Sequence, residues 1–158
     1  MTYQIADEPY ETPLAAYVVH PTAPLLASMV AGSWLAWPWF AFNAVAMGSP
    51  TKKREVGLCA GAFAITAVLA ATLIALVDAE LITTSLVIRL CVLAIVTFKL
   101  GASYYISLVQ GRTFHVYQYY GGKMRAAGAL LAAGYLLRGL VVGAIDDPLW
   151  IIVVSGGI

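Results

Sequence analysis

Residues 56–77 read VGLCAGAFAITAVLAATLIALV, a run of 22 residues without a charged side chain. A helix needs about 20 apolar residues to cross the hydrocarbon core of a bilayer, which is about 30 Å thick. The run therefore predicts a transmembrane helix. Only Asp78, Ala79 and Glu80 separate it from the next apolar run, which starts at Leu81. So short a connector predicts that the two helices form an antiparallel hairpin.

Three further apolar runs meet the same length requirement, and they cover residues 24–47, 81–103 and 126–145. The composition agrees, because 61% of the chain is hydrophobic and only 11% is charged, whereas a soluble domain carries about 25% charged residues. The sequence therefore predicts an all-α, polytopic integral membrane protein. We expect a single domain, a bundle of four transmembrane helices built from two hairpins.

The basic residues predict how this bundle is oriented. They gather in two loops between the predicted spans and consist of Lys52, Lys53, Arg54, Arg112, Lys123 and Arg125. Short loops rich in Lys and Arg stay in the cytoplasm. The N-terminal segment 1–23 and the C-terminal tail 146–158 are then both periplasmic, which places the protein in a bacterial inner membrane. The apolar piece 149–154 in this tail is too short to cross, and we expect it to pack against protein.

Arg89 and Arg138 are the main candidates for a binding site, because an arginine inside a span costs at least about 2.5 kcal/mol without a partner or water. Counting residues from the span ends places both at a similar depth in the outer leaflet. We therefore predict a site for an anion, which is a lipid phosphate, an anionic substrate or a carboxylate of another subunit. The alternative is that both side chains reach the outer interface.

The first predicted span contains Trp34, Trp37 and Trp39 around Pro38. These aromatic side chains suggest a wall for a quinone, a pigment or a lipid tail, and packing between helices is the alternative. Asn43 in the same span is expected to form a hydrogen bond with another helix.

Two segments near the inner face complete the candidates. Lys99 falls close to the inner end of the third span, where its amine is expected to reach the headgroups. The loop 110–125 is rich in aromatic residues and is expected to lie in the inner headgroup region. A docking surface for a cytoplasmic partner is the alternative, with the candidate residues Phe114, His115, Tyr117, Tyr119 and Tyr120.

The chain contains no catalytic or metal-binding motif, such as a Walker loop, GxSxG, HExxH or a Cys/His cluster. No motif indicates a cofactor, and we expect a bound phospholipid. The net charge of +1 predicts no nucleic-acid partner. Two hypotheses remain. The chain is either a non-catalytic subunit of a larger membrane complex, or a homo-oligomeric transporter, channel or lipid-handling protein that uses Arg89 and Arg138.

Overall fold

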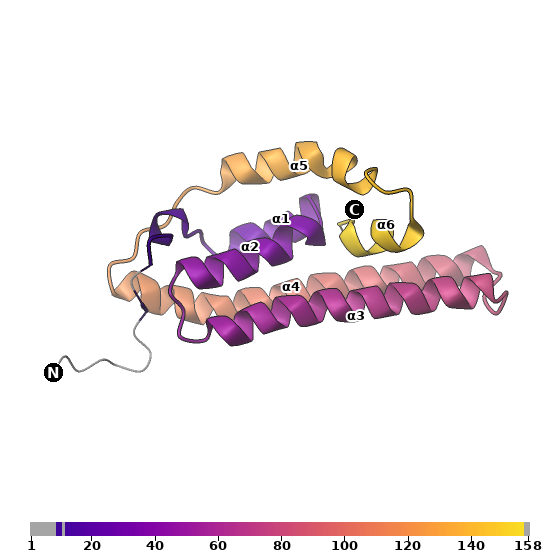
Figure 1. Ribbon diagram of the computed structural model, residues 1–158, viewed down its shortest axis with the longest axis horizontal. Helices are drawn as coiled ribbons and strands as arrows, with labels where there is room; N and C mark the ends of the chain where they lie inside the picture. The colour runs from indigo at the N-terminus through magenta and orange to yellow at the C-terminus, as the bar shows by residue number, and fades with distance from the viewer. Residues whose placement is uncertain (1–8, 11, 157–158) are drawn as a thin grey trace.

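The computed structural model describes residues 9–10 and 12–156. All regular secondary structure in this part of the chain is helical, and it contains no strand (Figure 1). A short 3₁₀ helix, η1, precedes six α-helices, and the elements in chain order are η1 (Ala15–Tyr17), α1 (Thr22–Val30), α2 (Ser33–Ala46), α3 (Lys52–Asp78), α4 (Ser85–Tyr119), α5 (Gly128–Val142) and α6 (Pro148–Val154).

Helices α3 and α4 form the long antiparallel hairpin that the sequence predicts (Figure 1). They have 27 and 35 residues, which corresponds to roughly 40 and 52 Å of helix. Both are long and apolar enough to cross a membrane. Helix α4 continues past the predicted end at residue 103, and it stops only at Tyr119, shortly before Gly121 with a φ of 83°. Residues 110–119 are therefore helical, and the expected loop over 110–125 is wrong in this part.

The predicted span over residues 24–47 is not one helix. Gly32 adopts a φ of 118° between α1 and α2, a conformation that only glycine adopts without strain. The chain reverses there, and α1 and α2 lie side by side (Figure 1). Asn43 near the end of α2 forms hydrogen bonds with Val19 just before α1, so the pair is antiparallel. This α1–α2 hairpin has both of its outer ends at one end of the molecule.

The start of the described chain lies at that same end. The Tyr10 amide donates to the Gly48 carbonyl over 3.0 Å, and the Thr12 hydroxyl donates to the Ala46 carbonyl over 2.5 Å. Tyr10 and Thr12 therefore adjoin the turn that leads into Lys52. The expected arrangement, with the N-terminal segment and the first basic loop on opposite sides, differs from this geometry because α1 and α2 fold back instead of crossing.

Helices α5 and α6 form a second, shorter reversal. α5 covers much of the predicted span 126–145, and Asp147 caps α6 by accepting the amides of Leu149 and Trp150 over 2.7 and 3.2 Å. α6 then runs back between α5 and α3, and its end meets the turn of the α1–α2 hairpin (Figure 1). The apolar piece 149–154 thus contacts protein, although only Val154 is fully buried.

The surface of these helices is strongly apolar. Leucines on α4 and α5 are more than half exposed, among them Leu86, Leu90, Leu93, Leu108, Leu136 and Leu140. Side chains of this kind are stable in contact with lipid. Two helices in the described part of the chain meet the length and hydropathy needed to span a membrane, so membrane association has support, whereas the four-span bundle is not confirmed.

Candidate functional site

A buried carboxylate lies at the start of α3. Glu55 is fully buried, and its two oxygens accept four hydrogen bonds. Ser49 and Thr51 in the preceding turn donate over 2.6 and 2.7 Å. From α4, Thr113 donates over 3.3 Å and Gln110 over 3.1 Å. The carboxylate therefore connects the turn before α3 to α4.

Gln110 and Asn43 extend this group into the α1–α2 hairpin. The Gln110 amide donates to the Phe40 carbonyl over 2.9 Å, and its oxygen accepts from Asn43 over 2.9 Å. Asn43 also pairs with both the amide and the carbonyl of Val19 at 3.0 Å. Both amide side chains are fully buried, so the prediction that Asn43 bonds to another helix is confirmed. Together with the contacts of Glu55, these hydrogen bonds connect α3 and α4 to α2 and to the segment just before α1.

A buried lysine lies near the Gly32 turn, at the opposite end of the α1–α2 hairpin. Lys99 on α4 is 4% exposed, and its ammonium donates to the carbonyls of Ile152 and Ser155 over 2.8 and 2.5 Å. The last carbonyls of a helix have no partner within the helix and carry partial negative charge. Lys99 satisfies two such groups around the end of α6. The expectation that it reaches the headgroups is therefore wrong.

The turn of the α1–α2 hairpin contacts the same end of α6. The Ser33 hydroxyl donates to the Val153 carbonyl, and the backbones of Gly32 and Gly156 touch. A Cβ atom at Gly32 would lie 2.9 Å from the Gly156 nitrogen and closer still to the Val154 carbonyl oxygen. The turn of the α1–α2 hairpin and the C-terminal end of α6 therefore meet inside the protein, beside Lys99.

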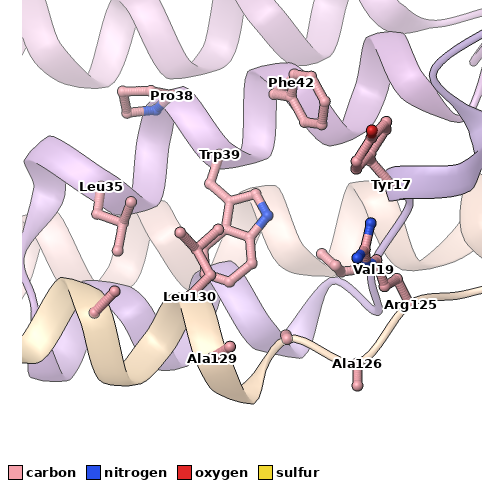
Figure 2. A pocket seen from close by; sticks show the side chains of 12 residues that line it. Tyr17, Val19, Leu35, Pro38, Trp39, Phe42, Arg125, Ala126, Ala129 and Leu130 are labelled. Atoms are coloured by element: carbon pink, nitrogen blue, oxygen red, sulfur yellow. The ribbon is translucent and has the colours of Figure 1, made fainter.

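An apolar groove lies outside this core, between α2 and α5. Its volume is about 610 Å³, and it is lined by Trp39 and Phe42 from α2 and by Leu130 with several alanines from α5. Figure 2 shows Trp39 between Leu35 on one side and Arg125 with Tyr17 on the other. The Arg125 guanidinium lies over the Tyr17 ring, 5.3 Å from its centroid. We call this feature the α2–α5 groove.

The three predicted tryptophans occupy different environments. Trp37 is fully buried, donates to the Ser103 hydroxyl over 3.0 Å and packs edge-on against Phe63. Trp34 donates to the Ala31 carbonyl over 2.9 Å within its own hairpin. Trp39 is 6% exposed, belongs to the same core cluster as Trp37 and also lines the α2–α5 groove. A wall formed by all three rings remains a prediction.

The predicted arginine pair lies on two separate helices. Arg89 is exposed on α4, and Arg138 is partly buried on α5. In Figure 1, α6 lies between α5 and the α3–α4 hairpin. An anion site shared by Arg89 and Arg138 remains a prediction.

The predicted docking residues are divided between the core and the surface. Phe114 and Tyr117 are buried, and Phe114 packs edge-on against His20. The exposed members are His115, Tyr119 and Tyr120. A docking role for these three remains a prediction, now on the end of a helix and the turn that follows.

The buried residues that sequence reasoning missed had a detectable signal. Lys99, Ser103, Gln110 and Tyr117 are spaced by four or seven residues and therefore share one face of a continuous helix. All four are buried. The signal was hidden because the helix was expected to end at residue 103.

Comparisons with protein-family models, with characterised proteins and with solved structures give no match for this chain. In the described part of the chain, no group of three or more His, Cys, Asp or Glu residues is placed to hold a metal ion. The function must therefore be argued from the geometry alone.

Proposed function

We propose that the chain is a multi-pass protein of a bacterial inner membrane and serves as a non-catalytic subunit of a larger membrane complex. The observation that carries the proposal is the exposure of α5. This helix has 15 residues, and Gly134 is its single buried residue. Tyr135, Leu136 and Leu140 are 62%, 76% and 71% exposed. At about 22 Å, α5 is shorter than a bilayer core of about 30 Å, and lateral packing against another subunit would stabilise it.

The hydrogen bonding of the interior supports a structural role over a catalytic one. Glu55, Gln110, Asn43 and Lys99 all bond to other parts of the same chain. Among the described residues, no buried side-chain nitrogen or oxygen lacks a hydrogen-bond partner. Buried polar groups that are fully satisfied stiffen a core and define its arrangement. These residues thus fix the α1–α2 and α5–α6 pairs against α3 and α4. Among the described residues, they leave no buried side-chain polar atom available to bind a substrate.

The proposed orientation keeps the basic end in the cytoplasm, in accordance with the distribution of Lys and Arg. This end carries the Lys52–Arg54 group at the start of α3, and Arg112 near the end of α4. Because the α1–α2 hairpin enters and leaves at this end, the residues before α1 are cytoplasmic too. The connector 79–84 and the turn 143–147 then face the periplasm. The expectation of a periplasmic N-terminal segment is replaced in this proposal.

Photo-crosslinking tests the role as a subunit. The photoreactive residue p-benzoylphenylalanine is placed at Leu136 or Leu140 on α5, and at Leu93 on α4 as the control that faces lipid. We expect the two α5 positions to crosslink, in native membranes, to one different polypeptide that also co-purifies in fixed stoichiometry in mild detergent. The proposal fails if α5 crosslinks only to lipid, as Leu93 does.

Cysteine labelling tests the orientation, in a background without Cys59 and Cys91. With a membrane-impermeant maleimide on intact cells, we expect Asp146→Cys to react, and Tyr10→Cys and Thr51→Cys to react only after permeabilisation. Asp146 and Tyr10 are both exposed in the structure. Reaction of Tyr10→Cys but not Thr51→Cys in intact cells would contradict the hairpin arrangement of α1 and α2.

A second candidate is a homo-oligomeric transporter, channel or lipid-handling protein. One observation favours it. Interrupted helices that meet inside the protein form the binding sites of many transporters, and here the Gly32 turn meets the end of α6 beside Lys99. In this case the α5 positions would crosslink one copy of the chain to another, which separates the two functions in a single experiment.

A further inference from the structure

We infer that the α2–α5 groove binds an anionic phospholipid, with the phosphate at Arg125 and an acyl chain along Trp39. The inference rests on the membrane location in the proposed function but not on the role as a subunit. Three features of the groove support this inference. They are its shape, its apolar lining and the Arg125 side chain at its mouth.

A close contact between α5 and the α1–α2 hairpin bounds the groove at one end, which we call the closed end. Near the closed end, Gly134 of α5 packs against Leu35 and lies close to Ala31, to which an added Cβ would approach within 3.2 Å. Between Gly128 and Gly134 the helix rises by about 9 Å. A helix is about 10 Å across and would need a groove that continues past Gly134. The closed end therefore favours a flexible chain, which can bend to fit the space, over a second helix.

The lining matches an acyl chain. It consists of large apolar side chains on one wall, such as Trp39 and Phe42, and small ones on the other, such as Ala129 and Ala133. The alanine side chains of α5 are too small to fill this space. A volume of about 610 Å³ lies within the usual range for ligand sites, about 300–1,000 Å³.

The mouth of the groove presents a positioned cation. The Arg125 amide donates to the Val18 carbonyl over 2.7 Å, which fixes the backbone, and the Tyr17 ring supports the guanidinium. The side chain remains exposed. A guanidinium can grip a phosphate with two parallel hydrogen bonds. The bond to Val18 also places Arg125 at the end of the molecule where Val19 meets Asn43, which is the basic end, where headgroups are expected.

The test uses phosphatidylglycerol and phosphatidylcholine with brominated acyl chains, because bromine quenches tryptophan fluorescence on contact. The purified full chain is titrated in mixed micelles with each lipid. We expect at least a fivefold preference for phosphatidylglycerol in the wild type. Arg125→Gln should remove most of that preference, whereas Arg112→Gln, a change of an exposed arginine at the same end, should retain it.

Two further variants locate the acyl chain. Trp39→Phe should remove the component of quenching that distinguishes phosphatidylglycerol. Ala129→Phe should fill the groove and abolish this component while leaving the helical circular dichroism unchanged. Native mass spectrometry should show one phosphatidylglycerol retained by the wild type and lost from Arg125→Gln.

Several outcomes would overturn the inference. These are equal quenching by both lipids in the wild type, an unchanged preference in Arg125→Gln, or retention of a free fatty acid in place of a phospholipid. A dimer of the chain that Ala129→Phe dissociates would assign the groove to a second copy and would equally refute lipid binding. None of these results affects crosslinking from Leu136, so failure of the lipid site and failure of the subunit role are distinguishable.

Discussion

Replacing Lys99 with methionine should release α6 from the interior. Methionine keeps an unbranched chain of similar length but cannot donate to the carbonyls of Ile152 and Ser155, which accept from the ammonium over 2.8 and 2.5 Å. A hydrogen bond to a charged group contributes about 1.5–3 kcal/mol, and the cost of burying the charge offsets part of the sum. We expect a net loss of about 2–3 kcal/mol in the docking of α6.

A change of 1.36 kcal/mol corresponds to a tenfold change in an equilibrium constant. The equilibrium between docked and undocked α6 should therefore shift roughly 30- to 150-fold toward the undocked state, which is large enough to measure. A helix of seven residues has little stability of its own. Hydrogen exchange followed by mass spectrometry in micelles should show faster exchange over residues 148–156 in Lys99→Met, with α3 unaffected. Lys53→Met, a change of an exposed lysine on α3, is the control. If the 148–156 peptide exchanges at the wild-type rate in Lys99→Met, Lys99 does not hold α6.

Two further substitutions test the core. Glu55→Gln replaces one carboxylate oxygen with an NH2 group, which donates and cannot accept, so either the Ser49 and Thr51 hydroxyls or the Gln110 amide loses its acceptor. The change should cost about 1–3 kcal/mol, visible as a lower Tm in detergent; an unchanged Tm would contradict this. Gly32→Ala should undock α6 and speed its exchange as Lys99→Met does, because a Cβ there meets the α6 backbone and the positive φ costs about 1–2 kcal/mol. Gly57→Ala, where a Cβ meets nothing within 4 Å, should leave the exchange of α6 unchanged, although alanine favours the helix by up to about 1 kcal/mol over glycine. Equal exchange of α6 in the two alanine variants would refute the tight contact.

The α3–α4 hairpin could be predicted from the sequence because it depends on two properties that composition reveals. These are the length of an uninterrupted apolar run and the shortness of the connector after Asp78. The α1–α2 hairpin could not be found in this way. Hydropathy does not distinguish a glycine with positive φ from one in a helix, so Gly32 between Ala31 and Ser33 left the run over 24–47 apparently continuous.

The same limit applies to the interior and to the candidate site. Lys99 was expected at the interface because its partners are backbone carbonyls more than fifty residues away in the sequence. They lie around the end of the apolar piece 149–154, which is too short to cross a membrane and contains no side chain that suggests a partner for a lysine. Trp39 could be proposed as part of a wall because an aromatic cluster is visible in the sequence. Its partners in the groove, Leu130 and Arg125, come from another predicted span and loop, and no spacing rule connects them.

The contact between α6 and the Gly32 turn has a consequence for how the protein is made. Among the described helices α6 is synthesised last, so Ser33 and Lys99 are made before the carbonyls that accept from them. Until α6 folds back, the Lys99 ammonium lacks both of these acceptors. That part of the nascent chain must therefore stay in contact with water or with another polar group until α6 is in place.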